Sequence, residues 1–353
     1  MKPSAPAPRA VGKSSAPAPR VLVIYKKSAF QLYVRERRSP RVVALLRKKH
    51  VTVARLRAAH DDHVKTLAAA KDVLRALGTR AVFRYRAEVG AAHEFDLVVT
   101  LGGDGTHGEV LGGLMAARGD AAARPRFGVL HAGTGGDFAR MLVAGAGASL
   151  EASLRALLAA ESAAIDVGTI DYVGDDGAPA SRYFLNLASV GVSGRVARLV
   201  NGSSKRLGGR LTFFLATLRA LWGYEPARVR LTIDGEDVGE HAIATVTVCN
   251  GRFAGGGMMF APNARLADGL LDVVLIRPSS LLRAALDSRA LYRGTHVHSP
   301  RVACWRGRDI VIEPVGREPA LVDVDGESPG RAPAHFRAHP GAVELLGARR
   351  EFL

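Results

Sequence analysis

Two glycine-rich turns carry the residues of this sequence that are best suited to bind an anion. They are Gly102-Gly103-Asp104-Gly105-Thr106 and Gly133-Thr134-Gly135-Gly136-Asp137, and each comes directly after an apolar segment. Glycines let phosphate oxygens approach the main chain, and the N–H groups at a helix N-terminus bind anions. The threonines add hydroxyl donors, and the aspartates can fix the turns, hold ribose hydroxyls or ligate Mg²⁺. Two such turns on neighbouring strand ends of one sheet indicate a phosphate site far better than one.

Carboxylates that could accept a proton occur in two Asp-Gly-Glu sequences. Asp234-Gly235-Glu236 lies between two alternating strand segments, as a hairpin turn would, so we expect it to be structural. Asp325-Gly326-Glu327 comes near the C-terminus, where the chain should return toward its first domain. A hydroxyl that attacks a phosphoryl group has to lose its proton, and a positioned carboxylate is a competent acceptor.

The first turn also formally matches the dinucleotide-binding fingerprint, as Gly103-x-Gly105-x-x-Gly108. In a Rossmann unit that fingerprint follows the first strand and an acid ends the next one. Here it follows the third expected strand, and the next strand ends without an acid. The chain has no Walker A spacing either, so both standard nucleotide motifs are disfavoured.

The elements that must position these turns predict an α/β first domain. Strand-like and helical segments alternate, which favours a parallel sheet covered by helices. The expected strands are residues 21–25, 81–85, 95–101 and 126–133, and the expected helices are 60–77, 108–117 and 149–162.

From Ile165 onward, short strands with turn signals predict a β-rich, sandwich-like second domain. The domains are expected at residues 20–162 plus 326–353 and at 163–325, so that the C-terminal segment returns to the first domain. One helical interruption is expected at 210–224, with Phe214, Leu218, Leu221 and Trp222 on one face. Such a stripe suits either plain core or the wall of a lipid-facing groove, and both interpretations stay open.

Composition limits the compartment and the class of protein. The 353 residues fit two domains, and the two cysteines, Cys249 and Cys304, suggest neither a disulfide framework nor a zinc site. No uninterrupted apolar run approaches the roughly 18 to 20 residues that span a bilayer, and no signal-peptide pattern begins the chain. We therefore expect a cytoplasmic protein that is soluble or peripheral.

The net charge of +16 is concentrated at the N-terminus. Residues 1–60 hold 15 Lys or Arg against the single acid Glu36, a net of +14, which leaves +2 for the rest. Residues 1–19 are rich in Pro, Ala and Ser and are expected to be a disordered basic tail. This asymmetry suggests a polyanionic partner, and because no nucleic-acid motif accompanies it, an anionic membrane surface is favoured over nucleic acid. A solvated basic tail and helix is the alternative.

Five separated motifs resemble the diacylglycerol kinase catalytic-domain family, which includes bacterial lipid kinases related to sphingosine and ceramide kinases and, more distantly, to NAD kinases. The resemblance covers about residues 20–348. It implies an ATP-dependent phosphotransferase whose first domain holds the nucleotide and whose β-sandwich domain forms the lipid cleft. The motifs are GGDGTHGEVLGGL, GTGGDFAR, FLNLASVGVSG, CNGRFAGGGMMFAPNARLADGLLDVVLI and VDVDGE.

The resemblance also implies roles for individual residues. It makes Asp325 the general base, with Glu327 as its partner or substitute, and the choice between the two stays open. It places a structural Mg²⁺ ion at the Asp268 carboxylate and the backbone carbonyls of Arg265 and Leu270. The ATP phosphates would be held by Gly102, Gly103, Asp104, Gly105 and Thr106, with Thr134 and Gly135 from the second turn.

The sequence departs from the family at three places. The family's Asn-Pro after the first strand is replaced by IYKKSAFQ, so Lys26, Lys27 or Ser28 would take over phosphate or adenosine contacts. The family commonly has Asn where Gly108 and Gly136 stand, which removes two hydrogen-bonding side chains. His107 is expected to face solvent at a helix start.

The resulting hypothesis is an ATP- and Mg²⁺-dependent lipid kinase, peripheral at the inner membrane face and active in phospholipid biosynthesis. The acceptor is not determined, since diacylglycerol, a sphingoid base or ceramide would each present a hydroxyl beside an apolar tail. The alternatives are a soluble-substrate kinase related to NAD kinase and a non-catalytic nucleotide-binding regulator. The resemblance also suggests a homodimer, although the sequence does not determine the oligomeric state.

Overall fold

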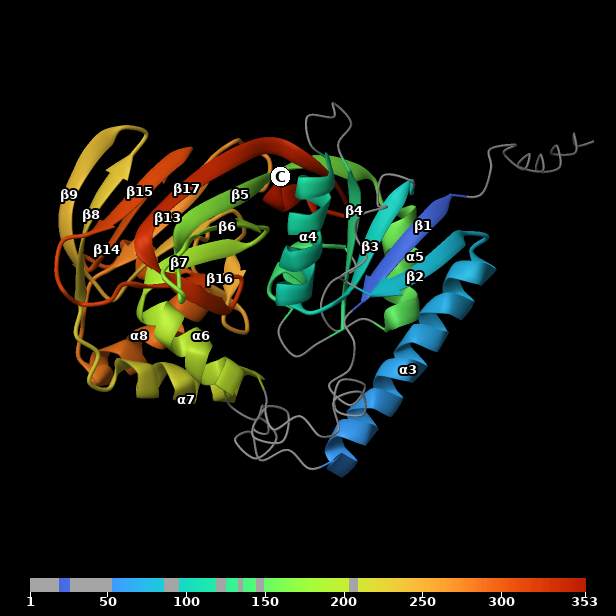
Figure 1. Cartoon of the computed structure of the whole chain (residues 1–353), viewed down its shortest axis with the longest axis horizontal. Helices are drawn as coiled ribbons and strands as arrows, with labels where there is room; N and C mark the ends of the chain where they lie inside the picture. Colours follow the sequence, from blue (N-terminus) through green and yellow to red (C-terminus); the bar gives the residue numbers. More distant parts are fainter. Residues whose placement is uncertain are drawn as a thin grey trace, which may run out of the picture.

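Parallel strands build the first domain of the computed structural model (Figure 1). The structure describes residues 19–25, 53–85, 95–118, 125–132, 136–143, 149–202 and 209–353. The strands lie in the order β4-β3-β1-β2, and every neighbouring pair is parallel. They are β1 (Arg20–Tyr25), β2 (Arg80–Tyr85), β3 (Leu97–Gly102) and β4 (Arg126–His131).

Helices cover both faces of this sheet. α3 (Val53–Ala76) and α5 (Leu150–Ala159) bury the face that carries Val21 and Val23. α4 (Asp104–Arg118) packs with the opposite face, where Leu22 lies. Successive side chains of a strand point to opposite faces, so a strand buried on both faces is apolar throughout, as in β1.

The second domain is an antiparallel sandwich. One layer runs β14-β13-β10-β7-β16, and the other contains β9-β8-β15-β17-β5-β6. Alternating apolar side chains from both layers form one core. The strands are β5 (Ser162–Gly174), β6 (Pro179–Phe184), β7 (Leu187–Gly191), β8 (Ala227–Ile233), β9 (Glu236–Ile243), β10 (Thr245–Cys249), β13 (Leu271–Ile276), β14 (Val302–Gly307), β15 (Asp309–Pro314), β16 (Leu321–Val324) and β17 (Glu327–Leu346), with the small pair β11 (Phe253–Ala254) and β12 (Met258–Met259) apart.

The long strand β17 joins the two domains. It pairs with β16, β15 and β5 in the sandwich, and its Glu344 and Leu345 then pair in parallel with β4 of the first domain. The predicted fold class, including the return of the C-terminal segment to the first domain, is confirmed. The domain limits at residues 162 and 325 stay predictions, and β17 contributes to both domains.

Helices flank the sandwich at one end. They are α6 (Val192–Gly202), α7 (Gly209–Leu221) and α8 (Leu281–Arg293), followed by the short η3 (Thr295–His298). The expectation of a single helical interruption was wrong, because α6 and α8 are helices as well. The signals of α8 were present in the sequence, since the Ser280 side chain accepts a hydrogen bond from the Arg283 N–H and Gly294 ends the helix at φ +71°.

Among the described helices, none combines the length and the apolar character needed to cross a membrane.

Candidate active site

The first glycine-rich turn leads directly into helix α4. The helix begins at Asp104, earlier than the predicted residue 108. The Thr106 N–H donates to the Gly103 carbonyl at 2.8 Å, and a Cβ on Gly102 would lie 2.8 Å from the Thr106 side chain. Only glycine therefore fits at position 102, which explains why the turn needs that residue.

Asp104 ties the two glycine-rich turns together. One carboxylate oxygen accepts N–H bonds from Gly136 at 3.2 Å and Asp137 at 3.4 Å, and the other accepts one from Phe138 at 3.4 Å. The acid therefore holds the second turn against the start of α4. This is the turn-fixing role among the roles that the sequence left open for Asp104.

Asp325 sits in a cradle of backbone donors. It follows β16, and its carboxylate accepts N–H bonds from Leu185 at 3.2 Å, Asn186 at 3.3 Å and Leu187 at 3.1 Å. These donors come from the turn between β6 and β7, because β7 pairs with β16 in the sandwich. The pairing thus brings the acid to residues that lie 138 to 140 positions earlier in the sequence.

The start of α4 approaches both acids of this turn. A Cβ built on Gly108 would lie 3.1 Å from an Asp325 carboxylate oxygen, and one on Gly105 would lie 3.3 Å from a Glu327 carboxylate oxygen. The two glycines bring the helix backbone close to the acids of the other domain. The structure therefore brings the first predicted turn and the two predicted catalytic acids into one site.

The acids at the end of β16 hold their protons unusually well. Burial raises the pKa of Asp325 to about 7, with the charge of Asp104 acting in the same direction and the backbone donors opposing it. Burial also raises the pKa of Asp323 to about 8, assisted by the charge of Asp325. An acid with a pKa near neutrality is suited to take up a proton and release it again.

Glu327 is placed differently. Its carboxylate pairs with the Arg182 guanidinium at 3.0 Å, and both side chains are about 40% exposed, at 39% and 42%. An ion pair this open to solvent is weakly held and screened by salt. Glu327 therefore differs from Asp325, whose carboxylate is held by three backbone N–H groups.

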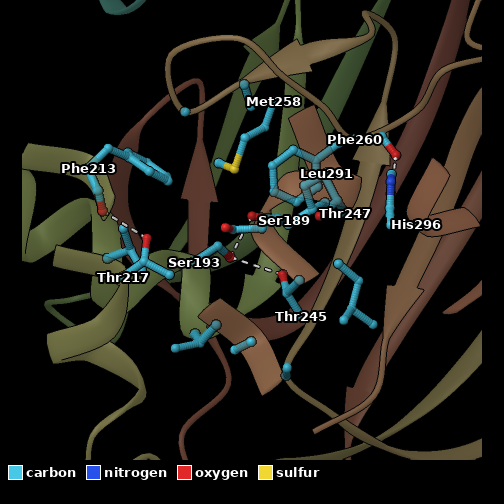
Figure 2. Close-up of a pocket in the computed structure, with 18 of the residues that line it drawn as sticks. Ser189, Ser193, Phe213, Thr217, Thr245, Thr247, Met258, Phe260, Leu291 and His296 are labelled. Carbon is cyan, nitrogen blue, oxygen red and sulfur yellow. Dashed lines mark hydrogen bonds between the residues drawn. The ribbon is translucent and has the colours of Figure 1, made fainter. Parts of the chain in front are cut away.

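A cavity of about 1040 Å³ extends from these acids into the second domain. Its polar end is lined by Gly103 to Thr106, Asp137, Asp325 and Glu327. The lining also includes residues of α6, α7 and α8. Figure 2 shows Phe213, Met258, Phe260 and Leu291 around this part of the cavity, beside the hydroxyls of Thr217, Thr245 and Thr247 and the ring of His296. The apolar wall includes Val192, Val196, Phe213, Phe214, Leu218, Leu221, Met258, Phe260 and Leu291.

The stripe predicted on helix 210–224 divides between two environments. Phe214, Leu218 and Leu221 line the cavity, as the groove-wall interpretation expected. Trp222 is 75% exposed and is not among the cavity-lining residues, so both interpretations were wrong for that residue.

A hydroxyl cluster, Ser189, Ser193 and Thr245, lies on the cavity wall (Figure 2). The Ser189 hydroxyl donates to Ser193 at 2.6 Å, and the hydroxyls of Ser193 and Thr245 lie 3.2 Å apart. These residues were not predicted as part of the site. The FLNLASVGVSG motif contains two of them, but their position on a cavity wall depends on the pairing of β7 with β10.

Comparisons with known proteins agree with this geometry. Residues 20–170 match the diacylglycerol kinase catalytic domain, and residues 186–347 match the YegS C-terminal NAD kinase beta sandwich-like domain. The chain is 33% identical over 260 residues to a "Probable lipid kinase YegS-like" of Xanthomonas euvesicatoria pv. vesicatoria (strain 85-10), covering 71% of this chain and 81% of that relative.

The chain belongs to the diacylglycerol kinase catalytic-domain family. It is also 28% identical over 256 residues to the "Diacylglycerol kinase" of Bacillus subtilis (strain 168), covering 71% of this chain and 78% of the relative. A solved diacylglycerol kinase structure from Bacillus anthracis str. Sterne has a TM-score of 0.58 at 19% identity, covering 95% of this chain and 98% of that one, and shows the shared fold. The predicted family is thus confirmed, and with it the expectation of a kinase.

The Asp268 carboxylate of the predicted Mg²⁺ site already has two partners. It pairs with the Arg306 guanidinium through one oxygen and accepts the Leu270 N–H at 3.1 Å through the other. The Arg306 charge therefore balances that of Asp268 in this structure. The assignment of Mg²⁺ to Asp268 and the backbone carbonyls of Arg265 and Leu270 stays a prediction.

Two further expectations can be compared with the structure. Asp234 does form the turn of the β8–β9 hairpin, as predicted.

The expectation that His107 faces solvent was wrong, because its ring is buried and lies 2.7 Å from the Thr100 hydroxyl. Burial lowers the pKa of His107 to about 4, so the ring is neutral at pH 7. Because α4 begins at residue 104, His107 lies on the inner face of the helix. The predicted helix began at residue 108, so His107 was expected before it and in solvent.

Some predicted residues lie outside the described part of the chain. They are Lys26 and its neighbours Lys27 and Ser28, Thr134 and Gly135 of the second turn, and the basic tail at residues 1–18. Their assignments stay predictions.

Proposed function

We propose that this kinase transfers the γ-phosphoryl group of ATP to a hydroxyl group of a membrane lipid. The observation that carries the proposal is the single cavity that joins the glycine-rich start of α4 and Asp325 to an apolar wall. A lipid alcohol needs both ends at once, because its reacting hydroxyl is polar and its chains are not.

The glycine-rich end is suited to the nucleotide phosphates. The N-terminal turn of α4 lines the cavity through Asp104, Gly105 and Thr106, and a helix N-terminus attracts anions. A Cβ on Gly103 would meet nothing within 4 Å, so this position leaves room at the backbone for a ligand. The Thr106 hydroxyl would add a donor.

Asp325 would act as the general base. The lipid oxygen attacks the γ-phosphorus, its O–H proton passes to the Asp325 carboxylate, and the bond from the γ-phosphorus to the β,γ-bridging oxygen breaks with its electron pair leaving on ADP. The three backbone donors fix the carboxylate, which makes the proton acceptor rigid before the substrate arrives.

Dependence on Mg²⁺ is part of the proposal and rests on the family. The ion would neutralise charge on the ATP phosphates. The contacts of Asp268 do not assign it a place among the described side chains.

The hydroxyl cluster would contact a second polar group of the acceptor. Ser189, Ser193 and Thr245 line the same cavity as Asp325. Ser189 donates to Ser193, and Thr245 can donate to the Val190 carbonyl, so the Ser193 proton is the one that could turn to an ester or amide oxygen of the acceptor. The cluster therefore favours an acceptor that carries such an oxygen beside its reacting hydroxyl.

The test is phosphoryl transfer from radiolabelled ATP, with Mg²⁺, to diacylglycerol, ceramide, sphingosine and NAD presented separately. Labelled lipid that Asp325→Asn does not produce would support the proposal. Labelled NADP with no labelled lipid would overturn it in favour of a soluble acceptor. ATP binding by calorimetry with transfer to no acceptor would overturn it in favour of a nucleotide-binding regulator.

A further inference from the structure

Two helices, α7 and α8, form part of the wall of the apolar cavity and contact each other. The cavity-facing residues of α7 are Phe213, Phe214, Thr217, Leu218 and Leu221. In α8 the cavity-facing residues include Ala284, Asp287, Ser288 and Leu291, which recur at helical spacing. Each helix therefore has a defined inner face.

The outer faces of the same helices carry large apolar side chains in solvent. Leu282 and Leu286 lie one turn apart on α8 and are 74% and 63% exposed. Leu215 on α7 is also exposed, and Trp222, which immediately follows α7, is 75% exposed. These four are among the nine large hydrophobic residues that are exposed in the described part of the chain. Their gathering on one pair of helices is not explained by the packing of the domain.

Arginines continue these outer stripes. Arg219 lies between Leu215 and Trp222 at helical spacing, and Arg289 and Arg293 extend the stripe of Leu282 and Leu286. All three arginines are exposed. Trp and Leu beside Arg on one helix face are typical of a helix that lies in a membrane interface.

Within α7 and α8 the acid among the described side chains is Asp287, which pairs with Arg283 at 3.4 Å and with Arg301. Beyond Trp222 two acids, Glu225 and Glu318, share a hydrogen bond with each other. On the outer faces of α7 and α8 themselves Arg219, Arg289 and Arg293 are exposed, so these faces are basic and complement an anionic lipid surface.

We propose that the outer faces of α7 and α8, together with Trp222, form the surface on which the protein docks on an anionic lipid bilayer. Trp222, Leu282 and Leu286 would enter the acyl boundary, and Arg219, Arg289 and Arg293 would contact anionic headgroups. The inner faces of the same helices line the cavity, so docking would bring the acceptor lipid to its apolar wall. This last step rests on the proposed lipid kinase function, whereas the docking itself does not.

The test compares binding of the full-length protein to phosphatidylcholine vesicles with and without phosphatidylglycerol. Trp222→Ala combined with Leu286→Ser should weaken binding to both by about tenfold or more, because interfacial binding scales with buried apolar area. Arg289→Gln combined with Arg293→Gln should weaken binding to the anionic vesicles alone, by roughly fivefold for each charge.

The control is Val143→Ser, which removes an apolar side chain of the first domain that is 51% exposed, against 63% for Leu286 and 75% for Trp222. It should bind vesicles as the wild type does. Unchanged vesicle binding of the Trp222 and Leu286 variant, or a loss no larger than that of the control, would overturn the proposal. A second result would also overturn it: light scattering, without vesicles, that finds a dimer for the wild type and a monomer for the Trp222 and Leu286 variant. The surface would then be covered by a second copy of the chain.

A second measurement separates docking from chemistry. If both proposals hold, the Trp222 and Leu286 variant phosphorylates a short-chain diacylglycerol in detergent micelles normally and loses activity toward vesicles. Vesicle binding that depends on this face, with no lipid phosphorylated by any variant, would support the docking surface and contradict the lipid kinase function. Equal activity of the variant and the wild type on vesicles would contradict the docking surface alone.

Discussion

The two Asp-Gly-Glu turns are nearly identical in local structure and differ in everything around them. Asp234 and Asp325 have φ of +49° and +46°, and the glycines after them have φ of +84° and +87°. Each turn joins two antiparallel strands, β8 to β9 and β16 to β17. The hairpin pattern that made Asp234 look structural therefore applies equally to Asp325.

Their surroundings separate the two acids. One Asp234 oxygen accepts the N–H groups of Arg308 and Asp309, both at 2.8 Å, at an exposed hairpin end. Asp325 instead lies on the cavity against the start of α4, where burial raises its pKa to about 7. The comparison teaches that an Asp-Gly turn sets the direction of a carboxylate. Whether that carboxylate belongs to a site depends on which other elements pack against it, here the start of α4.

The largest expected effect is the loss of activity in Asp325→Asn. An Asn can occupy the same positive-φ position but cannot take up the proton, so kcat should fall by about 10² to 10⁴-fold. Asp234→Asn is the matched control and should leave kcat unchanged. Equal activity losses in the two variants, measured in the lipid phosphorylation assay, would mean that the two turns do not differ in function.

The next effect concerns the close approach of α4 to Asp325. Gly108→Ala would place a Cβ 3.1 Å from the Asp325 carboxylate, so the acid must shift by a few tenths of an ångström. We expect kcat/KM to fall by about tenfold, since small displacements of a catalytic group are costly. Gly112→Ala in the same helix meets nothing within 4 Å and should keep full activity while adding about 0.5–1 kcal/mol to the free energy of unfolding. Full activity of both variants would show that this contact is unimportant.

A smaller effect is expected in the pH dependence. Activity should rise with pH through about 7, as Asp325 loses its proton. Asp323, whose pKa is about 8, still holds its proton where Asp325 loses its own, so Asp323→Asn should leave this limb in place. A limb moved to lower pH in Asp323→Asn would show that Asp323 is charged there.

Thermal unfolding of Asp323→Asn tests whether burial raises the pKa of Asp323. The folded pKa of Asp323, about 8, lies above the ordinary 3.8, so its contribution to stability is complete below pH 3.8 and is lost as pH rises through 8. Asn resembles the protonated form, so the Tm of Asp323→Asn should exceed that of the wild type above pH 8. If the Tm of Asp323→Asn were lower than that of the wild type above pH 8, the charged form of Asp323 would not be destabilised by burial.

The smallest effect is expected at the two glutamates. Glu327→Gln breaks a solvent-exposed pair with Arg182 and should change kcat by less than about threefold. Glu236→Gln in the other turn should have no effect. A loss as large as that of Asp325→Asn would make Glu327 the base and reverse the assignment.

The fold and the residues of the site could be predicted from the sequence more easily than the contacts among those residues. The alternation of β1 to β4 with helices, the apolar strands and the glycine-rich turns are local patterns, and the structure contains them. The helices α6 and α8 were missed because isolated β-branched and glycine residues interrupt α6 and because the caps of α8 were not weighed. His107 was misplaced because the predicted helix start was four residues too late.

The sequence by itself determined the turns at Gly102 to Thr106 and Asp325 to Glu327, because glycine content and strand periodicity act over a few residues. Only the tertiary structure decided that the Asp325 carboxylate accepts hydrogen bonds from the N–H groups of Leu185, Asn186 and Leu187, at sequence separations of 138 to 140. It also decided that Asp104 serves the second turn and that Asp268 is paired with Arg306. These contacts follow from the pairing of β7 with β16 and of β17 with β4, which a local pattern of residues does not specify.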